Sequence, residues 1–305
     1  MLNSPQMSEQ QPQRRDVALS QLGALGWSVD SLLAALHEFP STRDPVAYLS
    51  GSIGEGLANA ASDVDVLLIH DTDEAARPWP SRQVLLVQEN SAFNRLPSAG
   101  ANKAGCQVEH ASIPRLERLM DAMAGMLDPA DNRITILGYA DRRLLHRIKI
   151  GHALQRPADA AALQARIVSA GFDEYCLVCN LKEADSFIVD AKAALDTGRH
   201  ATAARMIQIA ASLTASAMLC SIGETNNNPK WSMELLERHT DRFPARRVEA
   251  LLKGIFIDER ALGDAELCSE ALSALCDAFV GLVADEPDRL DPQRYRFYSI
   301  VSGLK

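Results

Sequence analysis

The sequence lacks the short motifs that identify several large classes of enzyme. It contains no Gly-Lys-Ser/Thr phosphate loop and no Gly-x-Ser-x-Gly turn, and its seven histidines show no His-Glu-x-x-His pattern. These absences argue against a P-loop kinase or ATPase, an α/β-hydrolase and a zinc protease of that type. The glycine-rich run at residues 51–56 (GSIGEG) does not have the spacing of a dinucleotide-binding loop.

Positive charge is also scarce. The 305 residues include 31 Lys and Arg against 40 Asp and Glu, which gives a formal net charge of -9. Proteins that bind nucleic acids need Lys and Arg surfaces that neutralise the phosphates. The acidic balance therefore makes a nucleic-acid partner unlikely and favours a small-molecule acceptor or a protein.

The six cysteines form no clear metal site, and no membrane or secretion segment is apparent. Cys176 and Cys179 have the spacing of a metal-binding pair, but they lie in an apolar helical pattern without a second pair, which is typical of buried thiols. The apolar run at 206–222 contains Gln208 and several Ser and Thr residues, which indicates a buried helix rather than a membrane span. Free cysteines without a secretion signal predict a cytoplasmic location.

The most informative stretch is residues 48–70, YLSGSIGEGLANAASDVDVLLIH. The aliphatic run at its end predicts a strand, and because side chains alternate along a strand, Asp63 and Asp65 share one face, about 7 Å apart. Two such carboxylates repel each other unless a cation lies between them. Since Mg²⁺ prefers oxygen ligands and commonly combines carboxylates with substrate phosphates, the pair predicts a metal site for a nucleoside triphosphate.

The Gly-Ser pair ten residues upstream suits the same ligand. Gly51 lets the backbone approach a phosphate closely, and Ser52 offers a hydroxyl and a backbone N–H at the start of a short helix. Taken alone, an Asp-x-Asp pair is also compatible with two solvent-exposed residues after a Ser-rich turn. The combination of Gly-Ser, ten residues and Asp-apolar-Asp-apolar is far more specific.

This constellation, Gly51-Ser52 followed by Asp63-Val64-Asp65, resembles the signature of the nucleotidyltransferase superfamily that includes DNA polymerase beta. That family carries a third carboxylate on a later strand between apolar residues. Glu109 matches that position, although His110 stands where an apolar residue is more usual. The resemblance covers residues 45–115, and the remainder is only generally similar to the small-molecule, antibiotic (aminoglycoside-type) branch, which has a helical second domain.

The resemblance implies the transfer of a nucleoside monophosphate, most plausibly AMP from ATP, to a hydroxyl or other nucleophile of a small molecule such as an antibiotic or a biosynthetic intermediate. Pyrophosphate is released, and one or two Mg²⁺ ions are the cofactors. The implied roles are metal binding and catalysis by Asp63, Asp65 and Glu109, with Glu109 as either metal ligand or general base, and nucleotide binding by Gly51, Ser52 and, from the helical domain, Lys230.

Three alternatives stay open at this point. In the first alternative, the acceptor of AMP is a protein. In the second, the chain is a non-catalytic module that binds nucleoside triphosphates. The third, a polynucleotide-tailing enzyme, is disfavoured by the acidic charge. The identity of the acceptor, the choice of nucleotide and the oligomeric state are not specified by the sequence.

The fold class predicted is α+β. Residues 1–15 are expected to be a disordered tail, 16–156 a catalytic domain with a small mixed sheet and helices, and 157–305 a helical substrate-binding bundle. Two long apolar helices at 172–195 and 201–222 are expected to form an antiparallel hairpin.

Two further segments bear on the catalytic site. Residues 91–103 are expected to form an irregular loop. Its basic residues Arg95 and Lys103 are compatible with binding a triphosphate and, alternatively, with being solvated loop charges. A helix at 141–150 is dense in basic residues, including Arg143 and Arg147. This cluster is compatible both with phosphate binding and with a solvated or salt-bridged helix face.

Overall fold

The computed structural model describes residues 6–38, 44–77, 84–88, 91–96, 104–128, 135–226, 228, 230–257 and 263–290. The chain divides into two compact units. The first consists of residues 1–125 and 137–170, and the second of residues 126–136 and 171–305.

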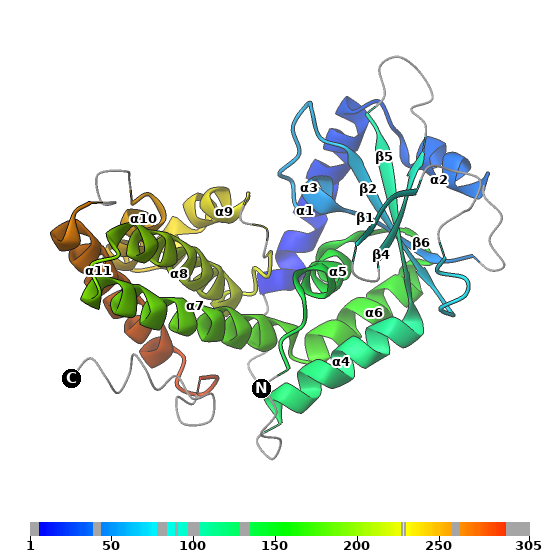
Figure 1. Cartoon of the computed structure of the whole chain (residues 1–305). Coiled ribbons are helices and arrows are strands. Elements are labelled where there is room, and N and C mark those ends of the chain that lie inside the picture. The colour runs from blue at the N-terminus through cyan, green and yellow to red at the C-terminus, as the bar shows by residue number, and fades with distance from the viewer. Residues whose placement is uncertain are drawn as a thin grey trace. The chain divides into compact units, whose positions relative to one another are not determined.

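The first unit is built on a mixed sheet with the strand order β3-β4-β5-β2-β1-β6 (Figure 1). Strands β2 and β5 are parallel, and the other neighbouring pairs are antiparallel. The strands are β1 Val46–Ser50, β2 Val64–His70, β3 Val84–Gln88, β4 Ser91–Leu96, β5 Cys106–Ser112 and β6 His152–Gln155. The helices are α1 Gln6–Ala24, α2 Val29–His37, α3 Gly51–Gly54, α4 Ile113–Leu127, α5 Tyr139–Ile150 and α6 Pro157–Ser169.

One face of this sheet forms a hydrophobic core with α1 and α2. Val64, Val66 and Leu68 alternate along β2 toward this face, and they belong to one buried cluster with Leu22 of α1 and Leu32 of α2. Helix α2 is capped at its N-terminus, because the Ser28 side chain accepts a hydrogen bond from the Ser31 N–H in a capping box. Burial of alternate aliphatic residues fixes the register of β2 and leaves residues 65, 67 and 69 on the opposite face.

Helices α5 and α6 cover that opposite face. The Tyr48 hydroxyl of β1 donates a hydrogen bond to the Ala160 carbonyl of α6 at 2.9 Å. Gln164 of α6 donates from Nε2 to the carbonyls of Ile148 at 3.0 Å and Gly151 at 2.7 Å. These bonds tie α6 to the sheet and to the end of α5.

The predicted boundary between residues 156 and 157 therefore differs from the structure. Residues 152–155, at the end of the predicted catalytic domain, form the edge strand β6 beside β1, and α6 belongs to the first unit. The second unit begins after Ala170 and also includes residues 126–136. Pro157 does not end a domain, because it lies in the first turn of α6, where its missing N–H costs nothing.

Two other segments correct the sequence-based expectation. Of the tail predicted to be disordered over residues 1–15, residues 6–15 lie in α1, where Gln, Glu and Arg are good helix formers, and residues 1–5 lie outside the described residues. The loop predicted over 91–103 is a strand, β4, as far as Leu96, paired with β5 on one side and β3 on the other. Lys103 lies outside the described residues.

The second unit is helical, as predicted. Its helices are α7 Phe172–Asp196, α8 His200–Ser221, α9 Ser232–Arg238, the short 3-10 helix Thr240–Arg242, α10 Ala245–Ile255 and α11 Ala265–Asp285. Helices α7 and α8 form the expected hairpin around a turn at Gly198, whose φ is +69° (Figure 1). Helix α10 packs closely on α8 at Gly254, where a Cβ added to the glycine would lie only 2.7 Å from the Ala211 Cβ. The α+β fold class followed by a helical bundle is thus confirmed.

Helices α8 and α11 are long and apolar enough to cross a membrane by length and composition alone, and the bent pair α1–α2 passes the same test if it counts as one span. In this structure 61% of the apolar window of α8 and 44% of that of α11 are buried by the rest of the chain. Burial inside the helical unit accounts for the apolar character of α8.

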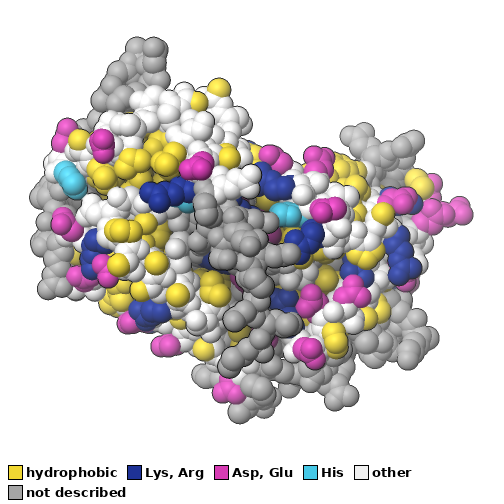
Figure 2. Space-filling model, turned by 180° about the vertical axis from the view of Figure 1, so that it is seen from behind, with side chains coloured by type: hydrophobic (Ala, Val, Ile, Leu, Met, Phe, Trp, Pro, Cys, Tyr) yellow, Lys and Arg dark blue, Asp and Glu magenta, His cyan; other side chains and the backbone are white. Residues whose placement is uncertain are grey.

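The surface charge is mixed. In the face drawn in Figure 2, Lys and Arg side chains are interspersed with Asp and Glu among the residues that are coloured. This distribution agrees with the formal net charge of -9.

Candidate functional site

Two of the three predicted carboxylates project from one face of adjacent parallel strands. In the register of β2 and β5, Asp65 lies opposite Gln107 and Leu67 lies opposite Glu109. Because alternate residues of a strand share a face, Asp65 and Glu109 both point away from the core that α1 and α2 cover. Asp63 directly precedes β2, in the same alternation.

Gly51 lies directly against Asp65. Its φ is +64°, in the left-handed region that favours glycine, and a Cβ at this position would lie 2.0 Å from Asp65 Oδ2. The backbone at the start of α3 therefore contacts the carboxylate without any side chain in between. The Gly-Ser and Asp-x-Asp parts of the sequence pattern meet in space at this point.

Asp63 is held by neighbours that the sequence analysis did not identify. The Gln107 side chain donates from Nε2 to Asp63 Oδ2 at 2.9 Å. A Cβ at Gly105 would lie 2.8 Å from Asp63 Oδ1 and 3.0 Å from Arg95 Nη2, so the missing side chain of Gly105 leaves space for both groups. Arg95 is exposed at the edge of this site.

Two arginines of α5 reach the carboxylates. Arg147 Nη1 donates to Glu109 Oε2 at 2.7 Å, and Arg147 Nη2 donates to Asp65 Oδ1 at 3.2 Å. Arg143, one helical turn earlier, places Nη2 at 3.6 Å from Glu109 Oε2 and its guanidinium 5.5 Å from the centroid of the Phe93 ring. Of the two roles that the sequence left open for this basic helix, the structure shows the salt-bridged face at Arg143 and Arg147.

Burial dominates the electrostatics of this cluster. Desolvation raises the pKa of Asp65 above its ordinary value, although Arg147 and Arg143 oppose the shift, while Glu109 and Asp63 add to it. For Arg147, burial lowers the pKa, but the carboxylates of Asp65 and Glu109 outweigh it, so the pKa stays raised. Arg147 is therefore a permanent cation beside a carboxylate that is costly to ionise.

Glu109 has the most unusual environment of the group. Its side chain is only 1% exposed, and among the described residues its Oε1 has no hydrogen-bond partner. A buried carboxylate oxygen without a donor or cation is unfavourable, and the described residues supply neither to this atom. Carboxylate oxygens such as this atom and those of Asp63 and Asp65 are the ligands that a hard divalent cation prefers, so the chemistry of the three side chains suits Mg²⁺. Their oxygens do not form a group of three within 4.8 Å in the described residues, so these side chains would have to shift to share one ion.

His110 points away from this site, as the alternation along β5 predicts. It is 2% exposed, its Nε2 donates to Asn94 Oδ1 at 3.0 Å, and its Nδ1 lies 3.1 Å from His70 Nε2. Burial lowers the pKa of His110 to about 3, with a smaller contribution from His70. The histidine that interrupts the apolar pattern around Glu109 is thus a neutral, hydrogen-bonded part of the core.

The remaining residues that the sequence predicts to bind the nucleotide lie in different parts of the chain. Ser52 is half-buried in α3, next to Gly51. Lys230 belongs to the second unit, where it is exposed and its Nζ lies 4.5 Å from the centroid of the Trp231 ring. The role of Lys230 in nucleotide binding stays a prediction.

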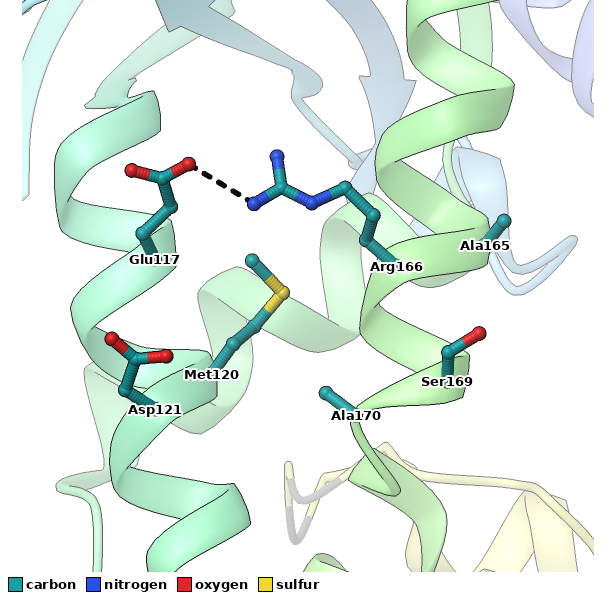
Figure 3. Close-up of a pocket in the computed structure, with 7 residues that line it drawn as sticks. All are labelled: Glu117, Met120, Asp121, Ala165, Arg166, Ser169 and Ala170. Atoms are coloured by element: carbon teal, nitrogen blue, oxygen red, sulfur yellow. Dashed lines mark hydrogen bonds and ion pairs between the residues drawn. The ribbon is translucent and has the colours of Figure 1, made fainter.

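A pocket of about 400 Å³ lies elsewhere in the first unit, between α4 and α6 (Figure 3). It contains none of the predicted site residues. The ion pair across it joins Arg166 Nη2 and Glu117 Oε1 at 3.0 Å, and both side chains are about half exposed. Because the Arg166–Glu117 pair is exposed to solvent, substitutions in this pocket serve as controls, and the pocket is not a candidate catalytic site.

Comparison with known proteins identifies no family for the chain. No protein-family model matches the sequence, and no curated protein matches it. Among solved structures, the chain is similar to the crystal structure of a nucleotidyltransferase-like protein from Exiguobacterium sibiricum 255-15, with 15% sequence identity over 86% of this chain and 76% of that chain and a TM-score of 0.47. A likeness at this identity carries no information about substrate or chemistry.

Proposed function

We propose that this protein is a nucleotidyltransferase that transfers AMP from ATP to a hydroxyl or other nucleophile of a small molecule. The observation that carries the proposal is the carboxylate pair of Asp65, which is 17% exposed, and Glu109, which is buried. It lies on one face of adjacent parallel strands, against the bare backbone of Gly51, with one carboxylate oxygen unpartnered among the described residues. An antibiotic or a biosynthetic intermediate is the proposed class of acceptor.

In the proposed reaction an acceptor oxygen forms a bond to the α-phosphorus of ATP, the bond to the β-phosphate oxygen breaks, and pyrophosphate leaves. Asp63 and Asp65 would hold Mg²⁺. When bound, this ion neutralises charge on the phosphates and lowers the pKa of the attacking hydroxyl. Glu109 would complete the metal site or accept the proton of the acceptor. The Gly51 backbone and Ser52 would hold the β- and γ-phosphates.

The direct test is pyrophosphate release from each of the four nucleoside triphosphates with Mg²⁺. Pools of hydroxyl- and amine-bearing antibiotics and a metabolite extract serve as acceptors, and the Asp63→Asn variant is the blank. Release that requires one nucleotide and one pool is the expected result, and it narrows the acceptor in the same experiment. Absence of release with every pool would contradict transfer to a small molecule.

Replacing Glu109 by glutamine is expected to reduce turnover by about a hundredfold or more, the usual contribution of a positioned acid or base. The amide keeps the shape of the side chain and an oxygen that accepts from Arg147, but it neither takes a proton nor carries charge. Nucleotide binding should fall less than turnover, which equilibrium binding of an ATP analogue measures alongside steady-state rates. Unchanged turnover would remove Glu109 from the reaction.

A module that binds nucleotides without chemistry is the second candidate. The ion pairs of Arg147 with Asp65 and Glu109 favour it, because a guanidinium already neutralises the carboxylates that would hold a metal. The two candidates differ in one measurement, since a binding module takes up Mg²⁺–ATP but releases no pyrophosphate with any acceptor. A protein acceptor is distinguished by labelled ATP added to a cell extract, where the label would enter protein.

The acidic net charge favours a small acceptor over a polynucleotide. A gel shift with RNA that disappears at high salt would contradict this expectation. The cytoplasmic location and the absence of a membrane partner stay predictions.

A further inference from the structure

Arg147 lies where a cation shared by Asp65 and Glu109 would lie. Its two terminal nitrogens contact one oxygen of each carboxylate, at 3.2 Å and 2.7 Å. The side chain is 12% exposed and comes from α5, which is fixed to the sheet through α6. Guanidinium and divalent cation therefore compete for the same two carboxylates.

The formal charges show what this competition does. The three carboxylates of Asp63, Asp65 and Glu109 and the two guanidiniums of Arg143 and Arg147 leave one net negative charge. Without Arg147 the same group would carry two, which one divalent cation neutralises. In a site with restricted access to water, a neighbouring cation strongly disfavours the entry of another.

Two buried atoms of opposite kind remain without a partner among the described residues. Glu109 Oε1 is an acceptor that lacks a donor or cation, and Arg143 Nε is a donor that lacks an acceptor. Arg143 itself is held by its approach to the Phe93 ring and to Glu109 Oε2. A metal–phosphate complex can satisfy both atoms at once, because its cation binds a carboxylate oxygen such as Glu109 Oε1 and a phosphate oxygen accepts from a guanidinium donor such as Arg143 Nε.

We propose that Arg147 is a positioning residue that acts as an internal counter-cation of the carboxylate site. It orders Asp65 and Glu109 in the absence of metal and lowers their affinity for the free divalent cation. The metal then enters together with the triphosphate, whose oxygens accept the guanidinium donors that the carboxylates release. The inference rests on the proposed nucleotide-binding role of this site, but it concerns the order and coupling of binding rather than the transfer itself.

The test measures the binding of Mn²⁺ from the loss of the electron paramagnetic resonance signal of the free ion. The titration is done with and without an ATP analogue that has a methylene group between the α- and β-phosphorus atoms. Wild type should bind Mn²⁺ weakly alone and more tightly with the analogue. Arg147→Gln should bind Mn²⁺ alone about tenfold more tightly than wild type, since one unit charge beside the site has been removed. In the same variant, the ATP analogue should increase the affinity for Mn²⁺ by a smaller factor than in wild type.

Two further variants separate charge from structure. Arg147→Lys keeps the charge but not the two-pronged contact, so its affinity for Mn²⁺ should remain close to that of wild type. Arg166→Gln removes a guanidinium from the half-exposed pair with Glu117, and it should change neither affinity (Figure 3). Melting curves of each variant establish that it is folded.

Equal affinity for free Mn²⁺ in wild type and folded Arg147→Gln would overturn the inference. If Arg147→Gln does not fold, wild type alone decides, because tight Mn²⁺ binding that the analogue does not improve is the contrary result. Failure of the proposed function would appear as an absence of pyrophosphate release, which is a separate measurement from Mn²⁺ binding. The Mn²⁺ measurements retain their meaning even if no acceptor yields pyrophosphate.

Discussion

Asp65→Asn is expected to abolish pyrophosphate release while the protein remains folded. The amide oxygen still accepts a hydrogen bond from Arg147 Nη2, which lies 3.2 Å from Oδ1 in the wild type, but the negative charge is lost. Removing one preorganised electrostatic group from an active site commonly costs about a hundred- to a thousandfold in rate, and a lost metal ligand costs more. Steady-state pyrophosphate release, compared with wild type at saturating Mg²⁺ and ATP, measures the loss.

The stability of the same variant should not fall. Burial raises the pKa of Asp65 in the folded state, so the stabilising contribution of this group is fully present below its unfolded pKa of about 3.9 and is lost as the pH rises through the folded pKa. At pH 7 the folded protein carries the cost of the ionised form, which asparagine does not have. The melting temperature of Asp65→Asn should therefore equal or exceed that of wild type at pH 7, and its advantage should shrink toward pH 4.

Asp63→Asn should likewise abolish transfer, and Asp121→Asn provides the matched control. Asp121 is an exposed carboxylate of α4 beside the Glu117–Arg166 pair, in the same unit but outside the carboxylate site (Figure 3). Its amide variant should keep full turnover. Near-normal turnover in either Asp65→Asn or Asp63→Asn, with the control behaving as expected, would contradict the proposed mechanism.

The part of the site that follows from local periodicity could be predicted from the sequence. Alternation along a strand places Asp63 and Asp65 on one face and turns His110 away from Glu109, whatever the rest of the sheet does. The same logic would have identified Gln107, which is two residues before Glu109 and therefore on its face, as a neighbour of the aspartates. That side chain donates to Asp63.

The rest depends on contacts between residues far apart in the chain. The composition of α5 showed a basic helix, but only its packing on the sheet determines that Arg147 reaches Asp65 and Glu109, 82 and 38 residues away. Strand β4 escaped detection for the same reason. Asn94 is a poor strand residue by itself, and it is completely buried because His110 of the neighbouring strand supplies its hydrogen bond.

Gly51→Ala is expected to lower both stability and turnover, and Gly198→Ala separates the two causes. Both glycines have positive φ, +64° and +69°, so each alanine bears a similar backbone strain, about 1–2 kcal/mol. At Gly198 a Cβ meets no atom within 4 Å, whereas at Gly51 it would lie 2.0 Å from Asp65 Oδ2. The extra clash should make Gly51→Ala less stable than Gly198→Ala by about 1–3 kcal/mol in urea unfolding.

The clash also predicts which function is lost. To admit a Cβ at residue 51, the Asp65 carboxylate has to leave its observed position, so turnover should fall as it does in Asp65→Asn, while Gly198→Ala keeps its turnover. A double-mutant cycle tests the cause directly, because Asp65→Gly removes the three side-chain atoms that a Cβ at Gly51 would meet. In that background the stability cost of Gly51→Ala should drop to that of Gly198→Ala. An undiminished cost would show that the glycine serves the backbone conformation alone and that its approach to the carboxylate contributes nothing to stability.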